Sequence, residues 1–300
     1  MCRKTFAAIA ALAAFAPLRA QQLPGRDLFR LPLGAMGEAP ALATAAGGGF
    51  WNPATLALPA SDALRVSIVS LNTPDEQGIT SLLGTAAYRI PRSRFTIGAS
   101  VAQADVGDLL RTDTDPQSMG PAIQYSSLIA SGIATASYGP GSVGVALRRR
   151  YATIDAASGH TTSLDIGGTL DRPAGLPVRV AASSFLLSRY REVEKASGMA
   201  AIEAYLPWTT NDLRGGVSYQ LDEGGGDERF IYGSGRVSML ELRGGIASQQ
   251  AYGYSTTRLR LGVGLHYGTY VVGIAREDGT AGLTASYQFL LTMSVPRVSK

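Results

Sequence analysis

The chain of 300 residues is 45% hydrophobic and 17% charged, and it carries 36 glycines, one cysteine and a formal net charge of +4. A single cysteine excludes a disulfide framework, and the share of charged residues lies below the usual quarter of soluble domains. Nowhere after residue 20 is there an apolar run of about 18 residues, so the sequence predicts no transmembrane helix.

Residues 1–20 have the pattern of a secretory signal peptide. Two basic residues, Arg3 and Lys4, precede an apolar run at 6–15, and Ala20 stands at the expected cleavage point. An N-terminal helix of the fold would need a partner face, which no later segment supplies. Without these residues the chain has no cysteine and a net charge of +1, so its pI of about 9.2 does not indicate nucleic-acid binding.

Residues 21–62 are rich in alanine, glycine and proline and are not expected to form a strand. Residues 41–46 could form one or two helical turns, and the glycines at 47–49 would end the helix. A short motif, Phe-Trp-Asn-Pro-Ala, follows at residues 50–54. We expect this region to form a compact irregular unit ahead of a β-domain.

From residue 63 onward, apolar and polar residues alternate with a period of two, as in strands with two unlike faces. For example, Leu64, Val66 and Ile68 alternate with Arg65 and Ser67. About fourteen such segments can be counted. They lie near residues 63–71, 81–89, 94–104, 126–138, 142–153, 162–171, 176–188, 199–206, 212–221, 229–238, 240–249, 257–267, 269–276 and 281–291.

The connections between these segments also alternate. Those after odd-numbered segments are mostly longer and polar, as at 155–161, whereas those after even-numbered segments are tight. Short turns at one end and longer loops at the other are typical of outer-membrane barrels, in which both termini are periplasmic. A soluble sandwich would turn its arginine-bearing face to water, but lipid outside and a polar lumen inside account for both faces. We therefore expect an all-β fold: a transmembrane, antiparallel, up-and-down β-barrel of about 14 strands.

The region before the strands carries a resemblance. Residues 33–43, Leu-Gly-Ala-Met-Gly-Glu-Ala-Pro-Ala-Leu-Ala, followed by Gly-Phe-Trp-Asn-Pro-Ala-Thr-Leu-Ala at 49–57, resemble the N-terminal hatch of the FadL-like outer-membrane family. Within it they are most similar to the PorV/PorQ-type branch. The resemblance implies that residues 21–62 form a hatch that plugs a barrel formed by residues 63–300. A lumen of this size is also too wide for side chains alone to fill.

The resemblance implies particular site residues as well. The expected ligand or gate residues are Phe50, Trp51, Asn52, Pro53 and Ala54 of the hatch motif. A kink in the third strand is also implied, and Gly98 is its candidate residue. The outer loops of this chain are shorter than those of the fatty-acid transporters of the family, so the uptake function stays open.

Charged residues recur on the polar face of the strands. The lumen charges that we single out are Arg148, Arg150, Arg258, Arg260, Asp165 and Glu203. Such a set suggests an ion-paired interior. It would either pin the hatch to the barrel wall or line an anion-selective path.

No pattern in the sequence indicates an enzyme, a cofactor or a metal site. His160 and His266 have no catalytic or metal-binding partner at useful spacing. Residues 139–144 match the letters of a dinucleotide motif, but a strand follows them where a helix would be required. The acidic, glycine-rich stretch at 222–228 could collect Ca²⁺ or ions bound to lipopolysaccharide, or be an exposed loop.

The expected location is the bacterial outer membrane, in contact with its lipid and lipopolysaccharide and not with nucleic acid. The first functional hypothesis is a barrel that binds or passes small hydrophobic compounds. The second is a PorV/PorQ-like accessory or docking component of a protein-secretion system. A barrel with a purely structural role is the third.

Overall fold

The computed structural model describes residues 23–44, 46–75, 77–107, 109, 123–190, 192–206, 212–223, 226–251, 253–279 and 284–297. The expected signal peptide, residues 1–20, lies outside the described residues. No helix in the described part of the chain is long and apolar enough to span a membrane.

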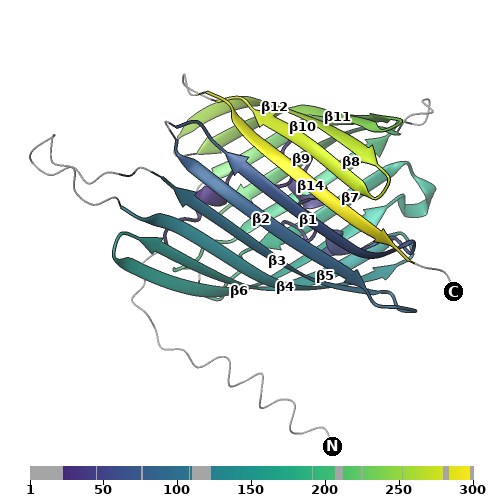
Figure 1. Cartoon of the computed structure of the whole chain (residues 1–300), viewed down its shortest axis with the longest axis horizontal. Helices are drawn as coiled ribbons and strands as arrows, with labels where there is room; N and C mark the ends of the chain where they lie inside the picture. Colours follow the sequence, from purple (N-terminus) through teal and green to yellow (C-terminus); the bar gives the residue numbers. More distant parts are fainter. Residues whose placement is uncertain are drawn as a thin grey trace, which may run out of the picture.

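Fourteen antiparallel strands form one closed barrel (Figure 1), in which each strand pairs with its neighbours in sequence and β1 pairs with β14. This confirms the predicted fold class. The strands are β1 (Asp62–Asn72), β2 (Ile79–Arg89), β3 (Phe95–Val106), β4 (Tyr125–Tyr138), β5 (Gly141–Ile154), β6 (Ala157–Asp171), β7 (Val178–Phe185), β8 (Ser197–Tyr205), β9 (Asp212–Asp222), β10 (Gly226–Val237), β11 (Leu240–Ala251), β12 (Tyr254–Tyr267), β13 (Tyr270–Glu277) and β14 (Ser286–Pro296).

The two faces of the wall differ as the alternation predicts. On β5, Val143, Val145 and Leu147 point outward and are about half exposed, at 56%, 48% and 59%. Between and beyond them, Ala146 and Arg148 point inward and are buried. Apolar side chains thus cover the outside of the barrel, while the inside carries small, polar, charged and some large apolar side chains.

Several strand boundaries differ from the prediction. β14 lies about five residues later than the predicted 281–291, and β7 ends at Phe185, before the predicted end at 188. The predicted loop at 155–161 is a tight turn, because β6 already begins at Ala157 and Asp155 adopts a positive φ of 52°. The strands extend beyond the alternating stretches here, since polar residues at the end of a barrel can continue a ladder in water. The contrast between long loops and short turns is therefore weaker than predicted.

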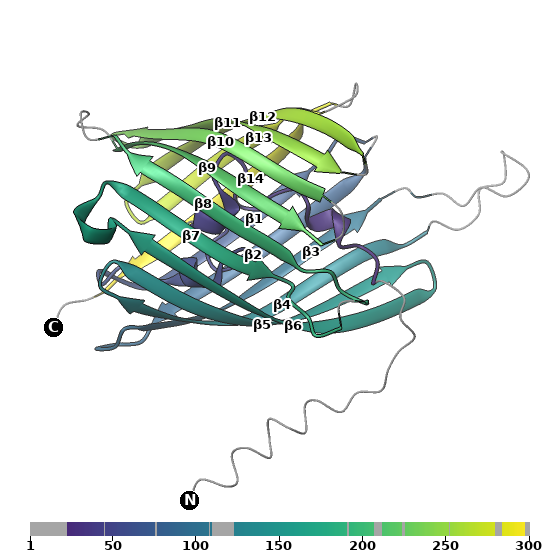
Figure 2. The same cartoon turned by 180° about the vertical axis from the view of Figure 1, so that it is seen from behind.

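The described N-terminal segment, residues 23–58, lies inside the barrel, and both views show it in purple among the strands (Figures 1 and 2). It contains three short 3-10 helices, η1 (Asp27–Phe29), η2 (Pro40–Leu42) and η3 (Pro53–Leu56). A fourth, η4 (Pro173–Gly175), joins β6 to β7. Apolar side chains of the segment, such as Leu33, Phe50 and Trp51, form one buried cluster with inward-facing residues of the wall.

The segment runs from one mouth of the barrel to the other. We call the end with the connections after odd-numbered strands the loop mouth, and the opposite end the turn mouth. At the loop mouth, Leu23 N donates to Val193 O between β7 and β8; near the turn mouth, Leu58 N donates to Thr96 Oγ1. Pro296 also lies at the turn mouth. The first described residue thus lies at the loop mouth and Pro296 at the turn mouth.

Candidate functional site

The hatch motif folds around the side chain of Asn52. Its Oδ1 accepts from Ala54 N at 3.0 Å and so caps the 3-10 helix η3, which begins at Pro53. Its Nδ2 donates to Ala41 O at 2.8 Å and to Gly168 O of β6 at 3.3 Å. One fully buried amide therefore joins the motif to an earlier turn of the N-terminal segment and to the barrel wall.

Backbone carbonyls of the motif accept hydrogen bonds from inward-facing side chains of the wall. The donors are Arg148 to Phe50 O at 2.5 Å, Ser183 to Trp51 O at 3.2 Å and Thr135 to Pro53 O at 2.7 Å. Strands β4, β5 and β7 thereby each hold one carbonyl group of the motif. Since buried carbonyls that lack donors are costly, these contacts determine where the motif lies.

The wall beside the motif is built of glycine. A Cβ atom at Gly144 would lie 2.5 Å from Pro53 C and 2.6 Å from Ala54 N, and one at Gly167 would overlap the Asn52 amide. Gly168 lies beside Gly167 on β6. We call Gly144, Gly167 and Gly168 the glycine window, because only backbone separates the motif from the outer surface there.

The β6–β7 ladder stops at this window. Only five residue pairs join the two strands, from Asp171 with Arg179 to Gly167 with Ser183, although β6 continues to Ala157. Beyond the window, Ile166 N donates to the Ser184 hydroxyl instead of a backbone carbonyl. The chain then turns at Leu186, whose φ is 58° and whose side chain is fully buried.

One backbone hydrogen bond and two that involve side chains replace the missing ladder. Leu187 N donates to Asp165 Oδ1 at 2.9 Å, Leu164 N donates to Leu187 O at 3.0 Å, and the Ser188 hydroxyl donates to Thr162 O at 3.3 Å. This part of the wall is held by fewer backbone hydrogen bonds than the complete ladders on either side.

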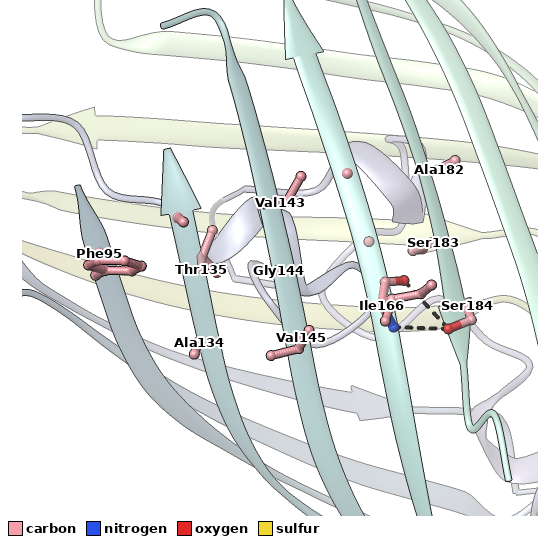
Figure 3. A pocket seen from close by; sticks show the side chains of 13 residues that line it. Phe95, Ala134, Thr135, Val143, Gly144, Val145, Ile166, Ala182, Ser183 and Ser184 are labelled. Atoms are coloured by element: carbon pink, nitrogen blue, oxygen red, sulfur yellow. Dashed lines mark hydrogen bonds between the residues drawn. The ribbon is translucent and has the colours of Figure 1, made fainter. Parts of the chain in front are cut away.

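On the outer surface, a hollow of about 720 Å³ lies over the window (Figure 3). Apolar side chains on β3, β5 and β6 surround it, including Phe95, Val143, Val145 and Ile166, with Ser184 on its β7 side. The hollow exists because Gly168 carries no side chain on this face. We refer to it below as the outer hollow.

Arg148 connects the motif to the open stretch of wall. Its guanidinium pairs with Asp165, donates to Ser131 Oγ at 3.1 Å and lies 5.3 Å from the centre of the Phe50 ring. Both charged side chains are 0% exposed. Asp165 in turn accepts from Leu187 N, so a single ion pair holds the motif and the end of β7 in place.

The other predicted lumen charges also point inward, and each has a partner. Arg150 pairs with Glu194 between β7 and β8 at 2.8 Å, and it donates to Leu23 O and Pro24 O of the N-terminal segment. The sequence reasoning missed Glu194 because it follows β7 in a connection and not on a strand, where a period of two would have placed its side chain.

Two further groups of charges lie elsewhere on the wall. Arg258 and Arg260 share Glu228 and Glu277, which brings together β10, β12 and β13. Glu203 accepts from Arg214 at 3.5 Å and from the Tyr232 hydroxyl at 3.1 Å. Glu228 and Glu277 were not predicted as partners, because strand register and not spacing brings them to the arginines.

Two residues singled out in the sequence, Gly98 and His266, lie in well-defined surroundings. β3 pairs with β2 and β4 without a register shift at Gly98, whereas the ladder between β6 and β7 is incomplete. His266 is not isolated, since its Nε2 lies 2.8 Å from Glu241 Oε2. Among the described residues, no group of His, Cys, Asp or Glu has the arrangement of a metal site.

Glu38 links the N-terminal segment to the wall on another side. Its carboxylate pairs with Arg243 at 3.1 Å, yet Oε1 accepts no hydrogen bond of good geometry. Burial raises the pKa of Glu38 above its ordinary value of 4.5, and the Arg243 guanidinium only partly offsets this. Glu241 and Glu203 raise the pKa further, while Arg214 lowers it.

We expect the Glu38→Gln variant to show how pH affects this contact. The folded state holds the Glu38 proton more tightly than the unfolded state, so this group contributes most to stability below pH 4.5, and the contribution is lost as pH rises through the raised folded pKa. The free energy of unfolding of the variant should therefore equal that of the wild type in acid. Above neutral pH it should be higher than that of the wild type. Urea titrations at several pH values measure the difference.

The control for this experiment is Asp27→Asn. Asp27 is 61% exposed on its side chain and pairs with Arg30 within the same segment. Its effect on the free energy of unfolding should be small, because an exposed ion pair contributes little to stability. A Glu38→Gln variant that is less stable than the wild type above neutral pH would show that the ion pair outweighs the cost of burial.

Comparisons with known proteins rest on structure alone. No protein-family model matches the chain, and no curated protein matches it. The fold is similar to the TodX monoaromatic hydrocarbon channel. The deltaS2S3 mutant has a TM-score of 0.59 at 10% identity over 88% of this chain and 97% of that chain, and the deltaS2 mutant 0.55 at 11% identity over 95% and 100%.

A bacterial polysaccharide outer membrane secretin gives a TM-score of 0.52 at 10% identity over 79% of this chain and all of that chain. At such low identities, these similarities show the fold alone.

Proposed function

We propose that this protein is an outer-membrane channel for small hydrophobic compounds, of the FadL-like kind. The motif at residues 50–54 supports the proposal through its resemblance to FadL-like hatches. The fold supports it through its similarity to structures of a monoaromatic hydrocarbon channel. The observation that carries it is the incomplete β6–β7 ladder directly beside Asn52.

The outer surface supports a membrane location. Large apolar side chains around the whole barrel are about half exposed, for example Leu82 at 53%, Ile166 at 55% and Ile231 at 66%. A soluble protein rarely exposes so much contiguous apolar surface. A closed barrel leaves no unpaired strand edge, which hydrocarbon requires.

In this proposal, residues 21–62 act as the hatch, residues 63–300 form the barrel, and residues 1–20 are a cleaved signal peptide. The hatch blocks a straight aqueous path through the lumen. A hydrophobic compound passes along the hatch to the motif and leaves sideways where the β6–β7 ladder ends. Phe50, Trp51 and Phe185 form an aromatic cluster beside this exit, with ring centres 4.8 to 5.5 Å apart.

The lumen charges have a structural role in this proposal. Arg148 and Arg150 donate to carbonyl oxygens of the hatch, and the arginines of β12 form ion pairs with two glutamates. This pairing favours pinned charges over an anion-selective path. The alternative of a PorV/PorQ-like component of a secretion system receives no support from the comparisons.

A disulfide lock across the open stretch of wall tests the route. Outside residues 1–20 the chain has no cysteine, so Ile166→Cys with Ser184→Cys introduces one defined pair across β6 and β7. We expect oxidised cells to take up toluene no faster than cells without the protein, because the exit can no longer widen. Reduction should restore the uptake.

The matched control places a disulfide in a complete ladder. Ala134→Cys with Val145→Cys joins β4 to β5, where the two residues are directly opposite one another on the outer face. This lock should leave toluene uptake unchanged. Equal uptake by both oxidised variants would rule out the sideways exit, and rapid uptake of a sugar by the wild type would rule out the hatch as a barrier.

A further inference from the structure

We propose that the outer hollow is a phospholipid-binding site, in which one acyl chain fills the hollow and Arg94 binds the headgroup phosphate. The site rests on the proposed membrane location. It does not rest on the passage of hydrocarbon, because a bound lipid sits outside the barrel wall. Its test measures binding and not uptake, so the two proposals fail separately.

The hollow has the character that an acyl chain requires. Its rim is formed by Phe95, Val143, Val145 and Ile166, and its floor by the backbone of the glycine window. Figure 3 shows these side chains around the open patch over Gly144. A hydrocarbon chain that fills the hollow is surrounded by apolar atoms on several sides. It therefore makes more van der Waals contacts there than it would on a flat wall.

The hollow also lies at the right height for a lipid anchored at the turn mouth. Phe95 is the first residue of β3 and Val143 the third of β5, both close to that mouth. Ile166 and Ser184 lie farther along the wall. A chain that follows the hollow therefore begins at the rim of the barrel and runs toward the centre of the membrane.

A cation stands where the headgroup would be. Arg94 is exposed in the β2–β3 turn, and its guanidinium lies 4.2 Å from the centre of the Tyr138 ring and 5.7 Å from that of Phe95. Phe95 thus borders both the cation and the hollow. Within the described ranges, Arg94 has no ion pair with a carboxylate.

These features favour a phospholipid over a free hydrocarbon as the occupant. The aromatic rings hold the guanidinium at the edge of the hollow, where its planar donors are available to an anionic oxygen pair. Phosphate oxygens suit this geometry, whereas a hydrocarbon has no group that an arginine can bind. The bound chain would also cover the glycine window from outside, where the wall is thinnest.

Native mass spectrometry of the full barrel tests the site with three probes that share the same acyl chains: phosphatidylglycerol, phosphatidylcholine and diacylglycerol. We expect the two phospholipids to bind about tenfold more tightly than diacylglycerol, since a charge-assisted contact to phosphate is worth roughly that factor. In the Arg94→Gln variant, both phospholipids should bind as weakly as diacylglycerol. Filling the hollow with Gly168→Phe should weaken all three.

The matched control is Arg149→Gln. Arg149 also lies over an aromatic ring, Tyr151 at 5.2 Å, but on the loop-mouth half of β5 and away from the hollow. This variant should bind all three probes like the wild type. Heat-modified mobility on gels reports whether each variant is folded, and Ala182→Phe fills the hollow from β7 if Gly168→Phe does not fold.

Two results would overturn the proposal. If Arg94→Gln and Arg149→Gln bind phosphatidylglycerol equally well, Arg94 does not hold the phosphate. If both folded filling variants retain wild-type binding, the acyl chain lies elsewhere on the barrel.

Discussion

Replacing Arg148 with methionine is expected to lower the free energy of unfolding by about 3–5 kcal/mol, the range found when one partner of a buried ion pair is removed. Asp165 is 0% exposed and would be left without its guanidinium partner. Phe50 O and Ser131 Oγ would lose their donor as well. Urea unfolding of the barrel refolded into lipid vesicles measures the loss.

Two further variants separate the ion pair from general effects of the substitution. In Arg148→Met with Asp165→Asn, no uncompensated charge is buried, so a large part of the lost stability should return. Arg149→Met changes the exposed neighbour and should alter the free energy of unfolding by no more than about 0.5 kcal/mol. If Arg148→Met and Arg149→Met have equal effects, Arg148 does not hold the hatch.

A methyl group at Gly144 is expected to push the hatch motif away from the wall. The new Cβ would stand 2.5 to 2.7 Å from backbone atoms of Pro53 and Ala54, and neither can move without shifting η3. Overpacking of this kind typically costs about 1–3 kcal/mol. In planar bilayers, Gly144→Ala should therefore increase ionic conductance, because the displaced motif no longer seals the lumen.

Gly132→Ala is the matched control for this substitution. Gly132 lies on β4, next to β5, and a Cβ at this position would meet nothing within 4 Å. Its conductance and stability should equal those of the wild type. A Gly144→Ala barrel that conducts no more than Gly132→Ala would show that the motif does not act as a seal.

Much of the barrel could be predicted from the sequence, because the two faces of each strand meet different surroundings and therefore carry different residues. On β5, for example, the alternation of valine and leucine with alanine and arginine reports which side of the sheet faces apolar surroundings. The motif at residues 50–54 could be identified because it resembles a known family motif and stands just before the first strand. Its position behind the glycine window was not, since that depends on which strands surround the lumen at that height.

The open stretch between β6 and β7 was not predictable for a local reason. Leu186, Leu187 and Ser188 continue an ordinary strand pattern, and no glycine marks the positive φ at Leu186. Gly98 was the candidate for a kink in the third strand because the resemblance implied one there. In the structure its missing side chain instead allows a close approach of the Ala86 backbone within an unbroken ladder.

The path of the N-terminal segment has a consequence for assembly. The three 3-10 helices of the segment pack against β3 to β8, whereas the barrel is closed by the pairing of β1 with β14, the first and last strands of the chain. The strands that contact these helices all precede β14 in the chain, so they can pair with one another before β14 pairs with β1. We therefore expect the sheet to curve around the first residues of the chain during assembly, with the pairing of β1 and β14 as the last step.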